Sequence, residues 1–269
     1  MSEQTEDART APRVALVTGA SRRRGIGAAI CRALAEAGTD IFFTHWVPFD
    51  RSQPTGADAE APAALVAELR RGGVRADHLA VDLADAAAPA RLLHEVTTRL
   101  GPPTILVNNA AHSTRDGYEA LDAATLDAHY AVNLRATALL SVGFARQFVA
   151  PDTGQSDPVG RIINLTSGQS RGAMPGELAY VATKGAIEAF TMTLAAEVAP
   201  LGITVNAINP GPTDTGWMTD EIKAFLLPQF PAGRLGQPED VARLVAFLAS
   251  PAGAWITGQI LHSEGGFQR

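Results

Sequence analysis

Short apolar runs rich in β-branched residues alternate along the chain with longer stretches in which apolar residues recur every three or four positions. The short runs predict strands and the longer stretches predict amphipathic helices. The expected strands are 14–18, 40–45, 74–81, 104–108, 161–166, 203–207 and 259–262, and the expected helices include one ending at Gly38, one over 61–71 and others beginning near Ala86, Ala123 and Glu177. Strands that are apolar nearly throughout are typical of parallel sheets buried on both faces. The pattern predicts an α/β fold: a single Rossmann-type domain with a doubly wound parallel sheet of about seven strands and helices on both faces.

Two segments lie outside this alternation. Residues 1–12 are polar and net acidic, which predicts a flexible tail before a domain over 13–269. Residues 46–60 are rich in Pro, Gly and Asp and predict a surface loop, inserted before the helix over 61–71.

Composition narrows the class of protein. A formal net charge of −6 argues against nucleic acid as the main partner, and apolar runs too short for a membrane helix predict a soluble protein. The single cysteine, Cys31, forms no internal disulfide and is interpreted as a small core residue, which favours a reducing, cytoplasmic location. We expect no metal site.

A glycine-rich segment, TGASRRRGIG, follows the first predicted strand. Gly19, Gly25 and Gly27 precede an apolar helix, and such a turn presents backbone amides to a diphosphate. A purely structural turn is the alternative, and the position at the first strand-to-helix junction favours dinucleotide binding.

Tyr180 and Lys184 stand four residues apart on a predicted helix, so the phenol and the ammonium share one face. A nearby cation is expected to lower the pKa of the tyrosine and to make the pair an acid/base unit. Ser167 ends a predicted strand thirteen residues earlier, where its hydroxyl can hold a carbonyl oxygen. The alternatives are a surface pair on a helix and a serine that caps a turn.

The motifs TGASRRRGIG, Asp82-Leu83, NNAA over 108–111, Asn133, Ser167, YxxxK and NPGPTDT occur in an order and spacing that resemble the short-chain dehydrogenase/reductase family over roughly 14–267. The segment GQPEDVARLVAFLASPAGAWITGQILHSEGG resembles the branch that includes 3-oxoacyl-acyl-carrier-protein reductases.

This resemblance implies roles for individual residues. Tyr180 would be the acid/base, Ser167 would polarise the substrate carbonyl, Lys184 would bond the nicotinamide ribose and Asn133 would hold a water of the proton relay. For Asn133 the alternative is a residue that bonds only to backbone. The implied cofactor-binding residues are Gly19, Ser21, Arg22, Arg24, Gly25, Ile26, Gly27, His45, Trp46, Asp82, Leu83, Asn109, Ala110, Ala111, Tyr180, Lys184, Pro210, Gly211, Thr213 and Thr215.

The chain departs from the family pattern in three places. Five residues separate Gly19 from Gly25, where the family has three, and Ala111 replaces a common glycine. His45-Trp46 stands at the end of the second strand, where an acidic residue would favour NAD(H). With three arginines in the neighbouring loop, we expect NADP(H) to be preferred and NAD(H) to be the alternative.

Taken with the resemblance, these features predict an oxidoreductase that acts on CH–OH groups: a ketone reductase, of the 3-oxoacyl type or another, that uses NADPH. The alternatives are an alcohol or sugar dehydrogenase on the same scaffold and a non-catalytic dinucleotide sensor. The resemblance also implies a homotetramer or homodimer, paired through the helices beginning near Ala123 and Glu177 and the last strand. The side chains proposed as an apolar wall over the nicotinamide are Met174, Trp217, Met218, Phe225 and Leu226; for the last two, packing of a short amphipathic helix is the alternative.

Overall fold

The computed structural model describes residues 13–52, 56–150 and 159–268. The tail predicted over 1–12 lies outside these residues. Seven strands form one sheet in the order β3-β2-β1-β4-β5-β6-β7, and every paired neighbour is parallel. The strands are β1 Val14–Val17, β2 Asp40–His45, β3 Ala76–Ala80, β4 Ile105–Asn108, β5 Gly160–Leu165, β6 Ile203–Asn209 and β7 Ile260–His262. The predicted doubly wound sheet is confirmed.

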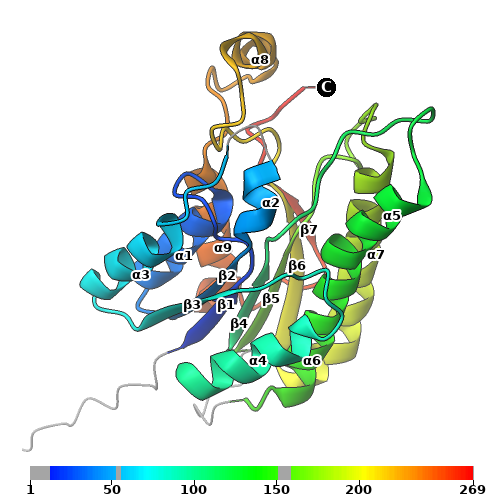
Figure 1. Ribbon diagram of the computed structural model, residues 1–269. Coiled ribbons are helices and arrows are strands. Elements are labelled where there is room, and N and C mark those ends of the chain that lie inside the picture. The colour runs from blue at the N-terminus through cyan, green and yellow to red at the C-terminus, as the bar shows by residue number, and fades with distance from the viewer. Residues whose placement is uncertain (1–12, 53–55, 151–158, 269) are drawn as a thin grey trace, which may run out of the picture.

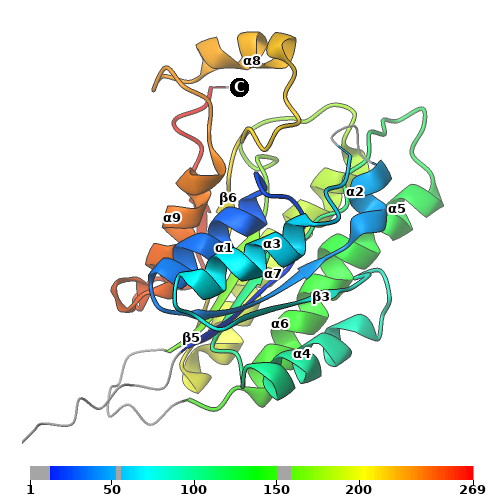
Figure 2. The ribbon, with the colours of Figure 1, turned by 60° about the vertical axis from the view of Figure 1, so that its left-hand side comes forward.

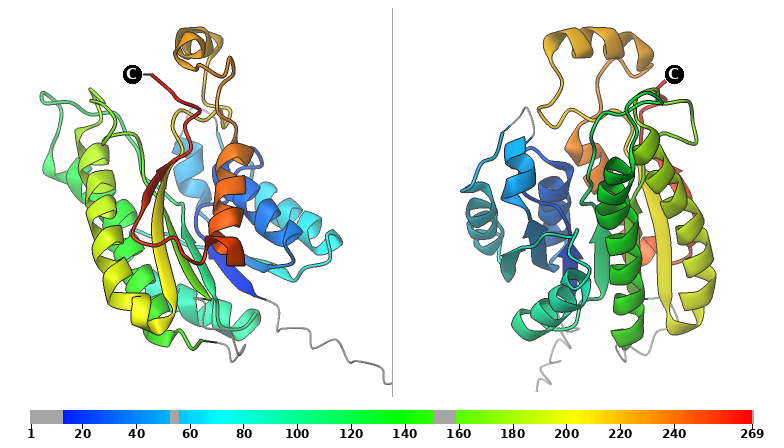
Figure 3. Two further views of the ribbon diagram at one scale, coloured as in Figure 1. Left: turned by 180° about the vertical axis from the view of Figure 1, so that it is seen from behind. Right: turned by 45° about the vertical axis from the view of Figure 1, so that its right-hand side comes forward.

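Two helical layers enclose the sheet (Figures 1 and 3). The α-helices are α1 Ile26–Glu36, α2 Val47–Ser52, α3 Ala61–Arg71, α4 Ala88–Arg99, α5 Ala123–His129, α6 Thr137–Gln147, α7 Leu178–Val198, α8 Asp220–Leu226 and α9 Pro238–Ala249. A π-helix, Tyr130–Ala136, joins α5 to α6. Helices α1, α3 and α9 cover one face of the sheet, and α4, α6 and α7 cover the other.

Alternate residues of each strand supply the two cores. In β1, Ala15 and Val17 face the layer of α1 and α9, whereas Val14 and Leu16 face the layer of α4 and α6. All four side chains are at most 3% exposed. Burial on both faces explains why β1 is apolar throughout.

The bounds of several elements differ from those predicted. The loop predicted over 46–60 contains α2, whose Pro48 suits the first turn of a helix. The helix expected near Ala86 begins at Ala88, because Asp82 and Asp85 accept hydrogen bonds from the amides of Ala84 and Ala87 and hold the preceding residues in turns.

Helix α8 projects from the body beyond the carboxyl ends of the strands (Figures 1 and 2). It contains no buried residue, and Phe225 is 73% exposed. The alternative of a packed helix residue is therefore wrong for Phe225, whereas its place in an apolar wall over the nicotinamide stays a prediction. Met218, just before α8, is buried.

Candidate active site

The loop between β1 and α1 packs against the end of β4 at distances that require glycine. Gly19 has a φ of +74°, and a Cβ atom there would lie 2.7 Å from the Cα atom of Ala110. A Cβ atom at Gly27 would lie 2.5 Å from the carbonyl oxygen of Gly19. The side-chain amide of Asn109 donates to the carbonyl oxygens of Thr18 and Gly19, at 2.8 and 2.9 Å. The loop is thus held by hydrogen bonds against the segment that follows β4. Its glycines leave the backbone free of side chains, so that a diphosphate can approach closely. We call this loop the cradle.

The two inserted residues are accommodated in a turn before the helix. The amide of Gly25 donates to the carbonyl oxygen of Arg22 at 3.0 Å, and α1 then begins at Ile26 with Gly25 as its N-cap. Glycine has no side chain with which to cap the first turn, so the amides at the start of α1 remain suited to an anion. The helix entry is intact, and the cradle fits a nicotinamide dinucleotide.

The three arginines of this loop face three different carboxylates. The ion pairs are Arg22 with Asp50 at 3.8 Å, Arg23 with Asp58 at 3.0 Å and Arg24 with Asp214 at 3.9 Å. The side chain of Arg22 is 35% exposed, against 56% for Arg23 and 69% for Arg24. Arg22 is therefore the least solvated of the three.

Tyr180 and Ser167 meet at the carboxyl edge of the sheet. Tyr180 lies in the first turn of α7, Ser167 follows β5, and their side chains are hydrogen-bonded to each other. The Oγ atom of Ser167 also lies 4.0 Å from the Sδ atom of Met174. Desolvation raises the pKa of Tyr180 to about 12; Ser167 opposes this increase and Glu177 adds to it. The phenol is therefore protonated at neutral pH.

Lys184 lies one turn further along α7 and is 2% exposed. Its Nζ atom donates to the carbonyl oxygen of Leu165 at 2.7 Å and lies 5.6 Å from the ring centroid of Tyr180. Burial lowers the pKa of Lys184 to about 8. The expectation of a lowered pKa for the phenol is wrong, because desolvation dominates at Tyr180 and raises the pKa.

Asn133 is fully buried within the π-helix and holds the segment after β4 in place. Its Oδ1 atom accepts from the amide of His112 at 2.7 Å, and its Nδ2 atom donates to the carbonyl oxygen of His112 at 2.9 Å and to Oγ1 of Thr183 at 3.1 Å. Thr183 stands between Tyr180 and Lys184 on α7. Asn133 therefore bonds a side chain as well as backbone, and a π-helix at this point is typical of a functional site.

Two histidines beside Tyr180 were not predicted as site residues. The rings of His112 and His129 lie edge to face at 4.7 Å, and His129 lies 6.5 Å from the ring of Tyr180. His129 is fully buried, with Nδ1 2.8 Å from the carbonyl oxygen of Thr125 and Nε2 accepting from the amide of Thr114. Because Nε2 accepts from an amide, Nδ1 is the ring nitrogen that donates, to the carbonyl oxygen of Thr125. The available sequence signal was the position of His112, directly after the NNAA motif.

The end of β2 presents neutral groups. The Nε2 atom of His45 lies 2.9 Å from Nδ1 of His78, and burial lowers the pKa of His45 to about 4, with His78 adding to the decrease. The Nδ1 atom of His45 is buried without a hydrogen-bond partner among the described residues. The amide of Trp46 donates to Oγ of Ser21 at 3.2 Å, which joins β2 to the glycine loop. The predicted residues of this corner are therefore brought together.

Other predicted cofactor residues line the same edge. Asp82 accepts from the amide of Ala84 at 2.8 Å, so its carboxylate shapes the turn after β3, and Leu83 is buried beneath that turn. Ala111 is partly exposed at the end of β4.

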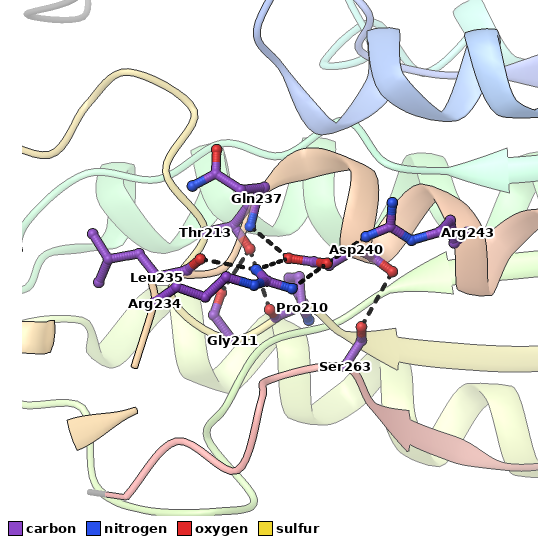
Figure 4. Close-up of polar contacts among 9 residues, drawn as sticks. All are labelled: Pro210, Gly211, Thr213, Arg234, Leu235, Gln237, Asp240, Arg243 and Ser263. Carbon is purple, nitrogen blue, oxygen red and sulfur yellow. Dashed lines mark hydrogen bonds and ion pairs between the residues drawn. The ribbon is translucent and has the colours of Figure 1, made fainter. Parts of the chain in front are cut away.

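The start of α9 supports the segment from Pro210 to Thr215 after β6 (Figure 4). Thr213 donates to the carbonyl oxygens of Pro210 and Gly211, and its strand-like bridge to Gly236 connects the segment to α9. The contacts that organise the helix entry are Arg234 to Asp240 at 2.7 and 2.8 Å, Arg243 to Asp240 at 2.6 Å and the amide of Gln237 to Asp240 at 2.9 Å. These charge-assisted bonds lower the pKa of Asp240 to about 2.

Cys31 is fully buried in the core, as predicted, and burial raises the pKa of its thiol. Within the described residues, no three His, Cys, Asp or Glu side chains gather as a metal ion would require. None of the helices described is both long and apolar enough to cross a membrane.

Comparisons with known proteins match nearly the whole chain. Residues 19–268 match the family model described as enoyl-(acyl carrier protein) reductase. The chain is 55% identical to the uncharacterized oxidoreductase YjdA of Bacillus subtilis, over 96% of this chain and 97% of that protein. It is 34% identical to the 3-oxoacyl-acyl-carrier-protein reductase FabG of Staphylococcus aureus, over 94% of this chain and 96% of that protein.

Solved structures are similar over nearly the whole chain. A short-chain dehydrogenase/reductase from Serratia marcescens has a TM-score of 0.83 and 33% identity, with 96% of this chain and 98% of that chain covered. A blue fluorescent protein from a metagenomic library, solved in complex with NADPH, has a TM-score of 0.82 and 32% identity with the same coverage. The chain belongs to the short-chain dehydrogenase/reductase family and is an oxidoreductase of that family.

Proposed function

We propose that this protein is an NADPH-dependent ketone reductase that acts on 3-oxoacyl-type substrates. The observation that carries the proposal is the hydrogen-bonded pair of Tyr180 and Ser167, in which desolvation keeps the phenol protonated. A protonated phenol beside a second hydroxyl can hold a carbonyl oxygen from two sides. The pair lies beside a cradle that fits the dinucleotide.

The reaction follows from the protonation states of these side chains. Ser167 and Tyr180 bind the carbonyl oxygen and draw electron density from the carbonyl carbon. The reduced nicotinamide, when bound, supplies a hydride to that carbon, and Tyr180 transfers its proton to the oxygen as the C=O π bond becomes a C–H and an O–H bond. Lys184, whose pKa is about 8, is mostly protonated at neutral pH and stabilises the phenolate left behind. The reverse oxidation uses the same groups.

The preference for NADPH is supported by the corner between β2 and the glycine loop. The side chains at the end of β2 are neutral, and Arg22 and Ser21 lie beside them. A guanidinium binds a phosphate well, whereas an acidic residue in the place of His45 or Trp46 at the end of β2 would favour NADH. The relative crystallised with NADPH is consistent with this choice.

Two observations support the proposed substrate class: the similarity to a 3-oxoacyl-acyl-carrier-protein reductase and an apolar side chain beside Ser167. The similarity to an acyl-carrier-protein reductase extends over the whole catalytic domain. Met174, in contact with Ser167, provides adaptable apolar surface of the kind an acyl chain contacts. We also propose that copies of the chain pair through α5 and α7 and through the segment around β7, where large apolar side chains are exposed.

Titration with NADPH and with NADH, followed by nicotinamide absorbance with a panel of ketones and acyl thioesters, tests the proposal. We expect tighter binding of NADPH and faster turnover of 3-oxoacyl thioesters than of simple ketones. Turnover confined to the oxidation of alcohols or sugars would contradict the substrate class. Cofactor binding without any turnover would mean that the protein is a sensor.

A further inference from the structure

Asp50 is a buried carboxylate at the cofactor corner that the proposed reaction does not use. It lies on α2, is 6% exposed and is hydrogen-bonded to the hydroxyl of Ser21. Its Oδ1 atom lies 3.8 Å from Nε of Arg22. Burial raises the pKa of Asp50, and these two partners act in the opposite direction. A carboxylate is stable in such a place only when donors face it, and Ser21 and Arg22 are those donors.

The other two carboxylates that face arginines of the loop are placed differently. The side chain of Asp58 is 46% exposed where it pairs with Arg23, so water solvates both groups. Asp214 is buried, but the side chain of its partner Arg24 is 69% exposed. Asp50 is thus the carboxylate directed at the least exposed arginine of the loop.

Helix α2 is held against the site at a second point. The ring of Phe49 contacts the ring of His112 at 5.4 Å, and Asn133 bonds the backbone of His112. Figure 1 shows α2 at the carboxyl edge of the sheet, between the two helical layers. The helix therefore reaches from the glycine loop to the segment that supports the catalytic residues.

We infer that Asp50 is a specificity-determining residue, an internal competitor for the adenosine 2′-phosphate. This inference rests on the proposed use of NADPH. A serine hydroxyl has one proton to donate, and Ser21 donates it to Asp50, so a 2′-phosphate gains this donor, and no longer competes with Asp50 for Arg22, only when Asp50 withdraws. NADH carries no phosphate there and does not displace the carboxylate. Asp50 thus weakens the binding of NADPH and leaves that of NADH unchanged. It therefore reduces the preference of the protein for NADPH over NADH.

Calorimetric titration with 2′,5′-ADP and 5′-ADP tests the inference without catalysis. Asp50→Asn should bind 2′,5′-ADP about ten- to a hundredfold more tightly, the worth of one charge-assisted hydrogen bond, and bind 5′-ADP as the wild type does. Asp58→Asn, in the same insertion, is the matched control and should change neither affinity. An equal gain for both nucleotides, or no gain for 2′,5′-ADP, would overturn the inference. Weaker binding of 5′-ADP by Asp50→Asn would instead indicate that Asp50 binds the ribose. That result would also overturn the inference.

A double-mutant cycle isolates the role of Ser21. Ser21→Ala should weaken 2′,5′-ADP binding more in the Asp50→Asn background than in the wild type, where the hydroxyl is already engaged. An equal loss of 2′,5′-ADP affinity in both backgrounds would contradict the proposed competition between Asp50 and the phosphate for Ser21. The unmodified protein provides a test that does not depend on folding of a variant: NADPH should increase amide hydrogen exchange in Val47–Ser52 relative to NADH. Equal exchange would contradict it, whereas failure of the wild type to bind either cofactor would overturn the proposed function itself.

Discussion

The side chains of Tyr180 and Lys184 are each shifted toward their neutral form by burial. The pKa of the phenol rises to about 12 and that of the ammonium falls to about 8. Near neutral pH the pair therefore consists of a proton donor beside a cation whose charge is lost in mild alkali. This combination suits a reductase, because the donor must arrive protonated and the cation must stabilise the phenolate.

The lysine can be observed directly, because the chain contains two lysines, Lys184 and Lys223. With ¹³C-labelled lysine, the Cε resonance of Lys184 should titrate near pH 8 in the cofactor-free protein, while Lys223→Arg assigns the signals. A midpoint near 10.5 in the folded protein would show that burial does not perturb the group.

The lowered pKa of Lys184 also affects how stability depends on pH. The unfolded chain retains the proton up to the ordinary pKa of 10.5, so this group adds stability as the pH rises from about 8 toward 10.5.

Gly27 allows a test of whether the loop between β1 and α1 is a rigid cradle for the cofactor. Gly27→Ala should lower the free energy of unfolding by about 1–3 kcal/mol, the cost of overpacking, and weaken cofactor binding, because its Cβ atom would lie 2.5 Å from the carbonyl oxygen of Gly19. Gly117→Ala, whose Cβ atom meets no described atom within 4 Å, should change stability by less than about 0.5 kcal/mol. Urea unfolding of both variants measures this. Equal stabilities would show that the loop relaxes and is not a rigid cradle.

Elements with strong local patterns were predictable, and those defined by distant contacts were not. The strand over 40–45 and the helix over 61–71 match β2 and α3 residue for residue, since one has a central apolar, aromatic run and the other is amphipathic. Helix α2 was predicted as loop because its stabilising contacts, from Asp50 to Ser21 and from Phe49 to His112, join positions far apart in sequence. Composition alone cannot reveal such contacts.

The same distinction applies to the candidate site. Ser167, Tyr180 and Lys184 follow from strand ends and helix spacing, which place them together whatever their neighbours are. The His112 and His129 rings, and the carboxylate of Asp50, depend on how separate loops meet. The raised pKa of Tyr180 escaped prediction for a related reason: spacing indicates a nearby cation, but desolvation depends on the packed structure.

At the scale of the whole molecule, two surfaces expose large apolar side chains. Along α7, Leu178 is 40% exposed and Met192 is 53% exposed, and their spacing of fourteen residues places them on one face of the helix. On the α9 and β7 side, Phe247 is 42% exposed and Trp255 is 95% exposed. Apolar surface of this kind marks interaction sites, which supports the proposed pairing of copies.

Light scattering during size-exclusion chromatography tests this assembly. We expect a dimer or tetramer for the wild type and a smaller species for Met192→Arg, because an unpaired charge at the centre of an interface disfavours association. Phe225→Arg provides a control, since Phe225 is more exposed than Met192, at 73% against 53%, but lies on the projecting helix α8. A monomeric wild type at micromolar concentration would contradict the proposal.

The most direct test of the catalytic assignment is the turnover of Tyr180→Phe in the wild-type reaction. The variant retains the ring and loses only the hydroxyl, so NADPH binding should be preserved while kcat falls by at least about a hundredfold, the usual contribution of a general acid. Lost turnover with retained cofactor affinity is the result that the account predicts. Undiminished turnover would show that Tyr180 is not the proton donor and would contradict the proposed mechanism.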